Sequence, residues 1–87
     1  MRIREPDIAW TQVGDEIVIL DTRTSVYSRL NSSAAKLWLA LSTGATSIDE
    51  MVTVLRKEYG IDEQIAAIDV MTFLTSLRAG NMLLEDE

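Results

Sequence analysis

SVYSRLN, residues 25–31, places a short strand directly before a helix cap. Its serines lower the apolar content, as expected for a strand that is half exposed to water. Side chains alternate along a strand and form two sets: Val26, Ser28 and Leu30 on one face, Tyr27 and Arg29 on the other. The strand edge has two interpretations. Either Arg29 protects it from aggregation, or it is open for pairing with another chain.

Two further strands precede this one and form an antiparallel meander with it. Residues 8–13 alternate between apolar and polar types, and Gly14-Asp15 provides a turn. Residues 16–21 contain four consecutive apolar residues, Ile17 to Leu20, which indicates a central strand buried on both faces. The first strand and the third strand, residues 25–30, are therefore expected at the edges.

The remainder predicts three helices, over residues 32–42, 47–59 and 62–79. The first two carry apolar residues at helical spacing: Ala34, Leu37, Trp38 and Leu41 in one, and Ile48, Met51, Val52, Leu55 and Tyr59 in the other. The fold class is therefore α+β, with a single domain over residues 8–84.

Capping residues and chain ends complete this prediction. The three helices have a cap candidate at each start: Asn31 or Ser32, then Ser47 in a capping box with Glu50, then Asp62. Gly60 and Gly80 end the second and third helices. Residues 1–7 are expected to be a flexible lead-in, residues 82–84 to fold back onto the core, and residues 85–87 to be a solvated acidic tail.

The third helix has more apolar surface than one buried stripe requires. Its main stripe consists of Ala66, Val70, Phe73, Leu74 and Leu77. A second face carries Ala67, Ile68 and Met71, with the polar Gln64, Thr75 and Arg78 around them. This face fits a binding surface, and it fits equally a second packing face against another element.

Composition excludes several classes of function. The 87 residues have a net charge of −6, with eight basic and fourteen acidic side chains, which disfavours a nucleic-acid partner. Without cysteine or histidine, the chain lacks the usual zinc ligands and the common nucleophile and base pairs of enzymes. We expect no enzyme activity, no cofactor and no metal. No stretch is long and apolar enough for a signal peptide or a membrane span, which favours a cytoplasmic protein.

Three segments resemble a known family. They are YSRLNSSAAKLW (27–38), SIDEMVTVLRKEYG (47–60) and DVMTFLTSLRAGNMLL (69–84), and the order of elements over residues 8–84 agrees. Together they resemble the PqqD-like recognition elements, which bind precursor peptides that are made on the ribosome and then modified. The resemblance implies a winged helix-turn-helix-like fold of three strands and three helices.

The resemblance also implies a mode of binding. The leader of the precursor adds as an extra strand to the third strand and packs against the third helix. Backbone pairing would then involve Val26, Tyr27, Ser28, Arg29 and Leu30. The side-chain floor would be Ala67, Ile68, Met71 and Leu74, with Thr75 and Arg78 at its rim.

One difference from PqqD itself indicates which members of the family this chain resembles most. Thr24-Ser25 stands where PqqD itself usually has a Pro-Glu pair, and relatives often have glycine at the position of Ser25. The chain is therefore more similar to the free-standing leader-binding proteins of lasso-peptide biosynthesis, which work with a separate leader peptidase and a cyclase. Their leaders usually carry a tyrosine and a proline three residues apart, and the tyrosine would enter near Met71 and Leu74.

Three alternatives remain open at this point. One is a PqqD-type chaperone for another peptide-modifying enzyme. Another is a DNA-binding winged helix, although the third helix sets only Arg78 against Asp62, Glu63 and Asp69. The third is a structural subunit that uses the same surface to form a dimer.

Overall fold

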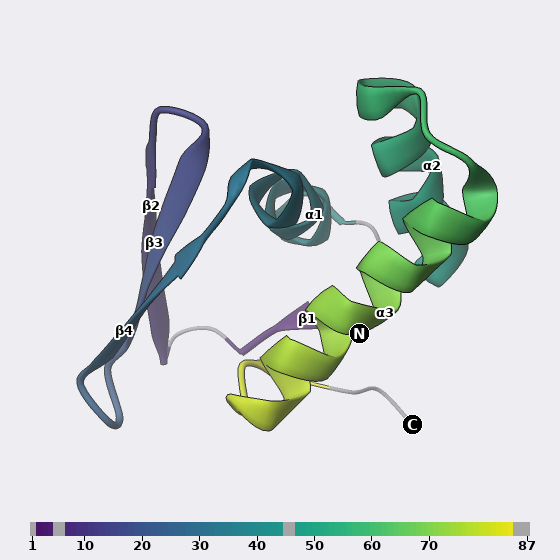
Figure 1. The fold of residues 1–87 in the computed structure, drawn as a ribbon. Helices are drawn as coiled ribbons and strands as arrows, with labels where there is room; N and C mark the ends of the chain where they lie inside the picture. The colour runs from purple at the N-terminus through teal and green to yellow at the C-terminus, as the bar shows by residue number, and fades with distance from the viewer. Residues whose placement is uncertain (1, 5–6, 45–46, 85–87) are drawn as a thin grey trace.

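A three-stranded antiparallel sheet is followed by three helices (Figure 1). The computed structural model describes residues 2–4, 7–44 and 47–84. The sheet has the order β2-β3-β4, made of β2 (Ile8–Val13), β3 (Glu16–Asp21) and β4 (Val26–Leu30). The helices are α1 (Ser32–Ser42), α2 (Ile48–Tyr59) and α3 (Glu63–Ala79). The predicted α+β class, the central strand and both edge strands are confirmed.

The two chain ends meet in a second, two-stranded sheet that the sequence does not predict. β1 (Arg2–Ile3) pairs antiparallel with β5 (Leu83–Leu84), with Ile3 opposite Leu83. Both of these residues are 5% exposed, so this pair closes one side of the core. The predicted flexible lead-in is therefore wrong for residues 2–3, and the predicted return of residues 82–84 to the core is confirmed. Residues 1, 5 and 6 and the expected acidic tail lie outside the described residues.

The faces of the sheet differ in burial. Residues Ile17, Ile19 and Asp21 of β3 point to the helical side and are buried, whereas Val18 and Leu20 on the other face are half-buried. The prediction that β3 is buried on both faces is thus right for one face and half right for the other. The helices cover only one side of the sheet (Figure 1).

α1 lies between the sheet and α3, and packs against β3, β4 and α3. Its core residues are Ala35, Leu37, Trp38 and Leu41; Ala34, predicted to be among them, is only half-buried. Trp38 is fully buried and meets Trp10 of β2 edge to face, with ring centroids 6.1 Å apart. This aromatic pair joins α1 to the sheet.

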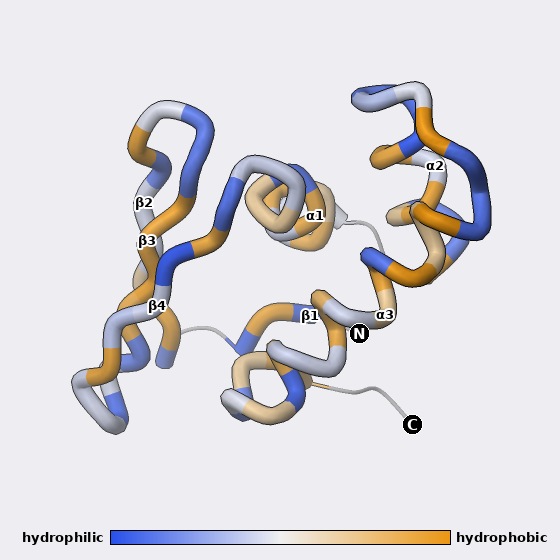
Figure 2. The backbone as a smooth tube through the Cα atoms, viewed as in Figure 1, coloured by the Kyte–Doolittle hydropathy of each residue, from blue (hydrophilic) through white to orange (hydrophobic). Residues whose placement is uncertain are grey.

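α2 and α3 complete the core through one buried stripe each. The stripe of α2 is Met51, Val52 and Leu55, while Ile48 and Tyr59, predicted on the same face, are 38% and 42% exposed. The stripe of α3 is Ala66, Val70, Phe73, Leu74 and Leu77, as predicted. Figure 2 shows apolar and polar residues alternating along both helices. In the described residues no helix combines the length and apolarity required to cross a membrane.

The predicted caps start the helices. Asn31 Oδ1 accepts a hydrogen bond from the Ala34 amide at 3.0 Å, and Asp62 Oδ1 accepts one from the Gln64 amide at 3.0 Å. Ser47 Oγ accepts from the Glu50 amide at 3.1 Å. These bonds satisfy amides that have no partner inside the helix.

Gly60 and Gly80 end α2 and α3, as predicted, but the two glycines have different backbone conformations. Gly60 ends α2 in the left-handed conformation, with φ of 63°. Gly80 follows α3 with φ of −84°, and the left-handed residue is instead its neighbour Asn81, with φ of 58°. Asparagine tolerates this conformation better than most residues do. Its backbone carbonyl and its side-chain oxygen each accept a hydrogen bond from Arg4, at 3.0 Å.

Candidate functional site

β4 has one unpaired edge. It pairs with β3 on one side only, and no other strand among the described residues pairs with it. The loop before β4 turns sharply: Ser25 has φ of 58° and its amide donates to the Asp21 carbonyl at 2.8 Å. Glycine adopts a left-handed conformation at lower cost than serine does, so Ser25 is a position that favours glycine. Along the free edge, alternate residues direct their N–H and C=O groups away from β3.

The register fixes the direction of each side chain of β4. Leu30 lies opposite Ile17, Ser28 opposite Ile19 and Val26 opposite Asp21, so these three side chains point to the helical side. Tyr27 lies opposite Leu20 and Arg29 opposite Val18, so both point to the other face of the sheet. A strand added to β4 would continue this alternation, with half its side chains directed toward the helices.

α3 carries an open apolar hollow on the face that the core leaves uncovered. We call it the helix hollow; it has a volume of about 480 Å³ and is lined by Ala67, Ile68, Met71, Thr72, Thr75 and Ser76. Ile68 is 65% exposed and Met71 is 43% exposed. Of the two interpretations of this face, the structure therefore agrees with an uncovered surface and contradicts a second packing face within the described chain.

A second hollow lies where β4 runs into α1. This junction hollow, of about 250 Å³, is lined by Leu30, Asn31, Ser33, Ala34, Leu37, Asp69, Thr72, Phe73 and Ser76. Thr72 and Ser76 line both hollows. The two hollows therefore adjoin along α3, and we refer to them together as the groove. It leads from the exposed patch of α3 to the end of the β4 edge.

The structure separates the predicted site residues into three groups. Ala67, Ile68, Met71 and Thr75 gather in the helix hollow, and Leu30 reaches the junction hollow. Val26, Tyr27, Ser28 and Arg29 lie along the free edge outside both hollows. Leu74 and Arg78 line neither hollow, and Leu74 is fully buried in the core.

Several residues of the groove are missed by the sequence prediction. Thr72 and Ser76 connect the two hollows, and Asp69 and Phe73 line the junction hollow. Asp69, Thr72 and Ser76 lie between the buried stripe and the apolar patch on the helical wheel, at spacings of three and four residues, whereas Phe73 belongs to the stripe itself. The polar members give no hydrophobic signal, so only the helical spacing itself could have pointed to them.

Few charged side chains lie at the groove. Asp69 is the acidic residue of the junction hollow. On the outer face of the sheet, Arg29 forms an exposed ion pair with Glu16, at 3.6 Å between Nη1 and Oε1. Within the described residues, no three acidic, histidine or cysteine side chains gather as a metal site would require. The geometry thus offers an open backbone edge and apolar hollows, which suit binding of an extended peptide.

Comparison with known proteins points to one family. A sequence model of the family described as coenzyme PQQ synthesis protein D (PqqD) matches residues 16–83. No curated protein sequence matched the chain.

Two solved structures are similar over nearly the whole length. One is described as TbiB1 in complex with the TbiA(beta) leader peptide; the TM-score is 0.90 at 25% identity, covering 100% of this chain and 99% of that one. The other is described as lasso peptide synthetase B1 complexed with the leader peptide; the TM-score is 0.83 at 32% identity, covering 97% and 96%.

Proposed function

We propose that this chain, which belongs to the PqqD family, binds the leader region of a precursor peptide made on the ribosome. The leader pairs with the free edge of β4 and seats alternate side chains in the groove. The chain itself contributes binding and no bond-breaking step. It works in the manner of the lasso-peptide proteins to which it is similar.

One observation carries this proposal: the strand with the unpaired edge, β4, ends in the same groove that contains the uncovered apolar hollow of α3. β4 directs Leu30 into the junction hollow, which adjoins the helix hollow through Thr72 and Ser76. A peptide strand on β4 gains backbone hydrogen bonds that do not depend on its sequence. Its inward side chains enter the groove, and these contacts select the sequence.

Binding alone is sufficient to promote modification of the precursor. A leader held on this chain keeps the attached core peptide near any enzyme that also binds the chain, which raises its local concentration. In this proposal the enzymes are a leader peptidase and a cyclase. An assembly with a different peptide-modifying enzyme would use the same groove.

The exposed face of α3 does not favour DNA. In a DNA-binding winged helix this helix would enter the major groove and would need cations for the phosphates. Here the uncovered face presents Ile68, Met71 and Asp69. Leader binding therefore accounts for the surface better.

A charge in the helix hollow tests the proposal. Met71→Glu places a carboxylate where an apolar peptide side chain would be buried, and loss of that burial costs about 1.5–3 kcal/mol. We expect leader affinity to fall at least about tenfold, since about 1.4 kcal/mol corresponds to that factor. The measurement is a fluorescence titration with labelled leader peptides of lasso precursors, beginning with TbiA(beta).

Val13→Glu is the matched control. Val13 is 57% exposed in β2, outside the groove, and the substitution changes the net charge by the same amount. We expect wild-type affinity for this variant. Equal affinity of the Met71 variant and wild type would show that the groove is not the site, and absence of binding to every leader in the panel would overturn the proposed function.

A further inference from the structure

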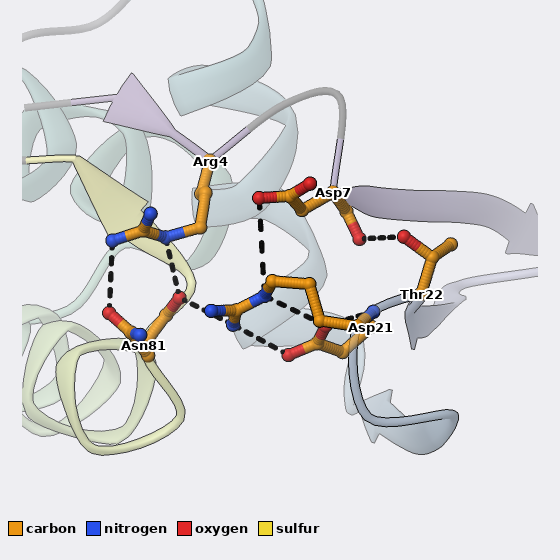
Figure 3. A network of polar contacts seen from close by, with 6 residues as sticks. Arg4, Asp7, Asp21, Thr22 and Asn81 are labelled. Carbon is orange, nitrogen blue, oxygen red and sulfur yellow. Dashed lines mark hydrogen bonds and ion pairs between the residues drawn. The ribbon is translucent and has the colours of Figure 1, made fainter.

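The two walls of the groove come from different parts of the chain. Leu30 at the end of β4 and the start of α1 form one wall, and α3 forms the other. At the opposite end, the loop before β4 and the turn after α3 approach each other. Polar side chains join them there (Figure 3).

Arg23 is the centre of this connection. It lies in the loop between β3 and β4, and holds the carboxylate of Asp21 with Nε at 3.2 Å and Nη2 at 2.9 Å. Asp21 ends β3, and its side chain is only 6% exposed. Nη2 of Arg23 also donates to the carbonyl of Asn81 at 3.3 Å. Because Asn81 follows the cap of α3 directly, one guanidinium joins the hairpin of β4 to the end of α3.

Arg4 supports the same carbonyl from the other side. Its Nε donates to the Asn81 carbonyl at 3.0 Å and its Nη2 to the Asn81 side-chain oxygen at 3.0 Å. Its own amide donates to the Met82 carbonyl at 2.8 Å, which extends the pairing of β1 with β5. The left-handed turn at Asn81 is thereby fixed by side-chain and backbone contacts.

We propose that Arg23, Asp21, Asn81 and Arg4 form a clasp that sets the spacing between β4 and α3 and so determines how tightly a peptide binds. This inference rests on the proposed function of the groove. Arg23 is a positioning residue in this account and does not touch the peptide.

The spacing affects affinity because a bound peptide must contact both walls of the groove at the same time. Its backbone has to pair with β4 at hydrogen-bond distance while its side chains fill the hollow of α3. If the walls are held at the correct spacing beforehand, binding does not have to order them. Arg23 is 34% exposed, but the Asp21 side chain is only 6% exposed, so loss of Arg23 leaves a buried carboxylate without its partner and lowers stability as well as affinity.

A double-mutant cycle between Arg23 and Met71 distinguishes spacing from a purely structural role. Arg23→Ala is expected to weaken leader binding about three- to tenfold, measured well below the unfolding midpoint of the variant, which falls because the buried Asp21 carboxylate loses its partner. Met71→Ala weakens binding directly. If the clasp acts through the groove, the loss of affinity in the double variant is smaller than the product of the two single losses. Such coupling is expected even though Arg23 and Met71 lie on different elements.

Arg56→Ala provides the control. Arg56 lies on α2, pairs with Glu63 at 4.0 Å and carries the same charge as Arg23, so wild-type affinity is expected for this variant. Unchanged affinity of Arg23→Ala, or losses that multiply in the double variant, would overturn the clasp while wild-type binding still supports the proposed function. If wild-type protein binds no leader peptide in the panel, the proposed function itself fails.

Discussion

Asp21 is the charged residue that the described core holds most deeply, with 4% of its surface exposed. It ends β3 at the base of the hairpin, and its carboxylate accepts hydrogen bonds from the amide and the guanidinium of Arg23. The hydrogen bond from the Arg23 side chain is the main cause that lowers the pKa of Asp21 below its ordinary value of 3.8, and burial opposes it. The ionised form is therefore favoured in the folded state.

The stability of the chain should depend on this carboxylate in acid. Because the folded pKa is lowered, its stabilising effect is complete above the ordinary value of 3.8 and is lost as the pH falls through the lower folded value. Asp21→Asn removes the charge and keeps the shape. We expect the variant to be less stable than wild type near neutral pH, with the difference shrinking below about pH 4. Urea unfolding from about pH 7 down to about pH 2 measures this, and a constant difference would contradict the assignment.

At the scale of elements, the strands and helices follow from strong local signals. All three strands of the main sheet and all three helices fall within one residue of the predicted bounds. Alternation along residues 8–13 and helical periodicity after residue 47 are each supported by a cap or turn residue at the boundary. The strands at the chain ends have two residues each, too short for any period, and were not predictable.

The candidate site is predictable only in part, and Leu74 shows why. It lies three residues from Met71 and four from Val70, on the border between the exposed patch and the buried stripe. Periodicity assigns it to either face, and the structure places it in the core. Thr72 and Ser76 belong to the groove because α3 lies beside the start of α1, and that placement depends on tertiary packing. The joining of the two hollows is therefore a property of the folded chain.

The two faces of α3 should separate stability from binding. Leu74→Ala creates a cavity in the core and should lower the free energy of unfolding by about 2–5 kcal/mol. Ile68→Ala shortens a side chain that is 65% exposed, so its effect on stability should stay within about 0.5 kcal/mol while leader affinity falls. Denaturant unfolding and peptide titration on the same two variants give the comparison. Equal destabilisation by both would contradict the division of the helix into a core face and a binding face.

At the scale of the whole molecule, helices cover one face of the sheet and leave β4 open at its edge (Figure 1). α1 joins the sheet to α3 at one end of the groove, and polar contacts between Arg23 and Asn81 join them at the other. The unpaired edge of β4 and the apolar surface of α3 are thus held in a fixed position relative to each other. β2 forms the other edge of the same sheet and offers an internal comparison for any claim about β4.

Amide hydrogen exchange of β4 with and without bound leader peptide tests the central claim most directly. If the leader adds as a strand, alternate amides of Val26–Leu30, those directed away from β3, become protected on binding. The outward amides of Ile8–Val13 on the opposite edge should keep their exchange rates. Protection confined to every second residue of β4 is the predicted result. Unchanged exchange along β4 in a saturated complex, or protection along β2 instead, would contradict strand addition at this edge.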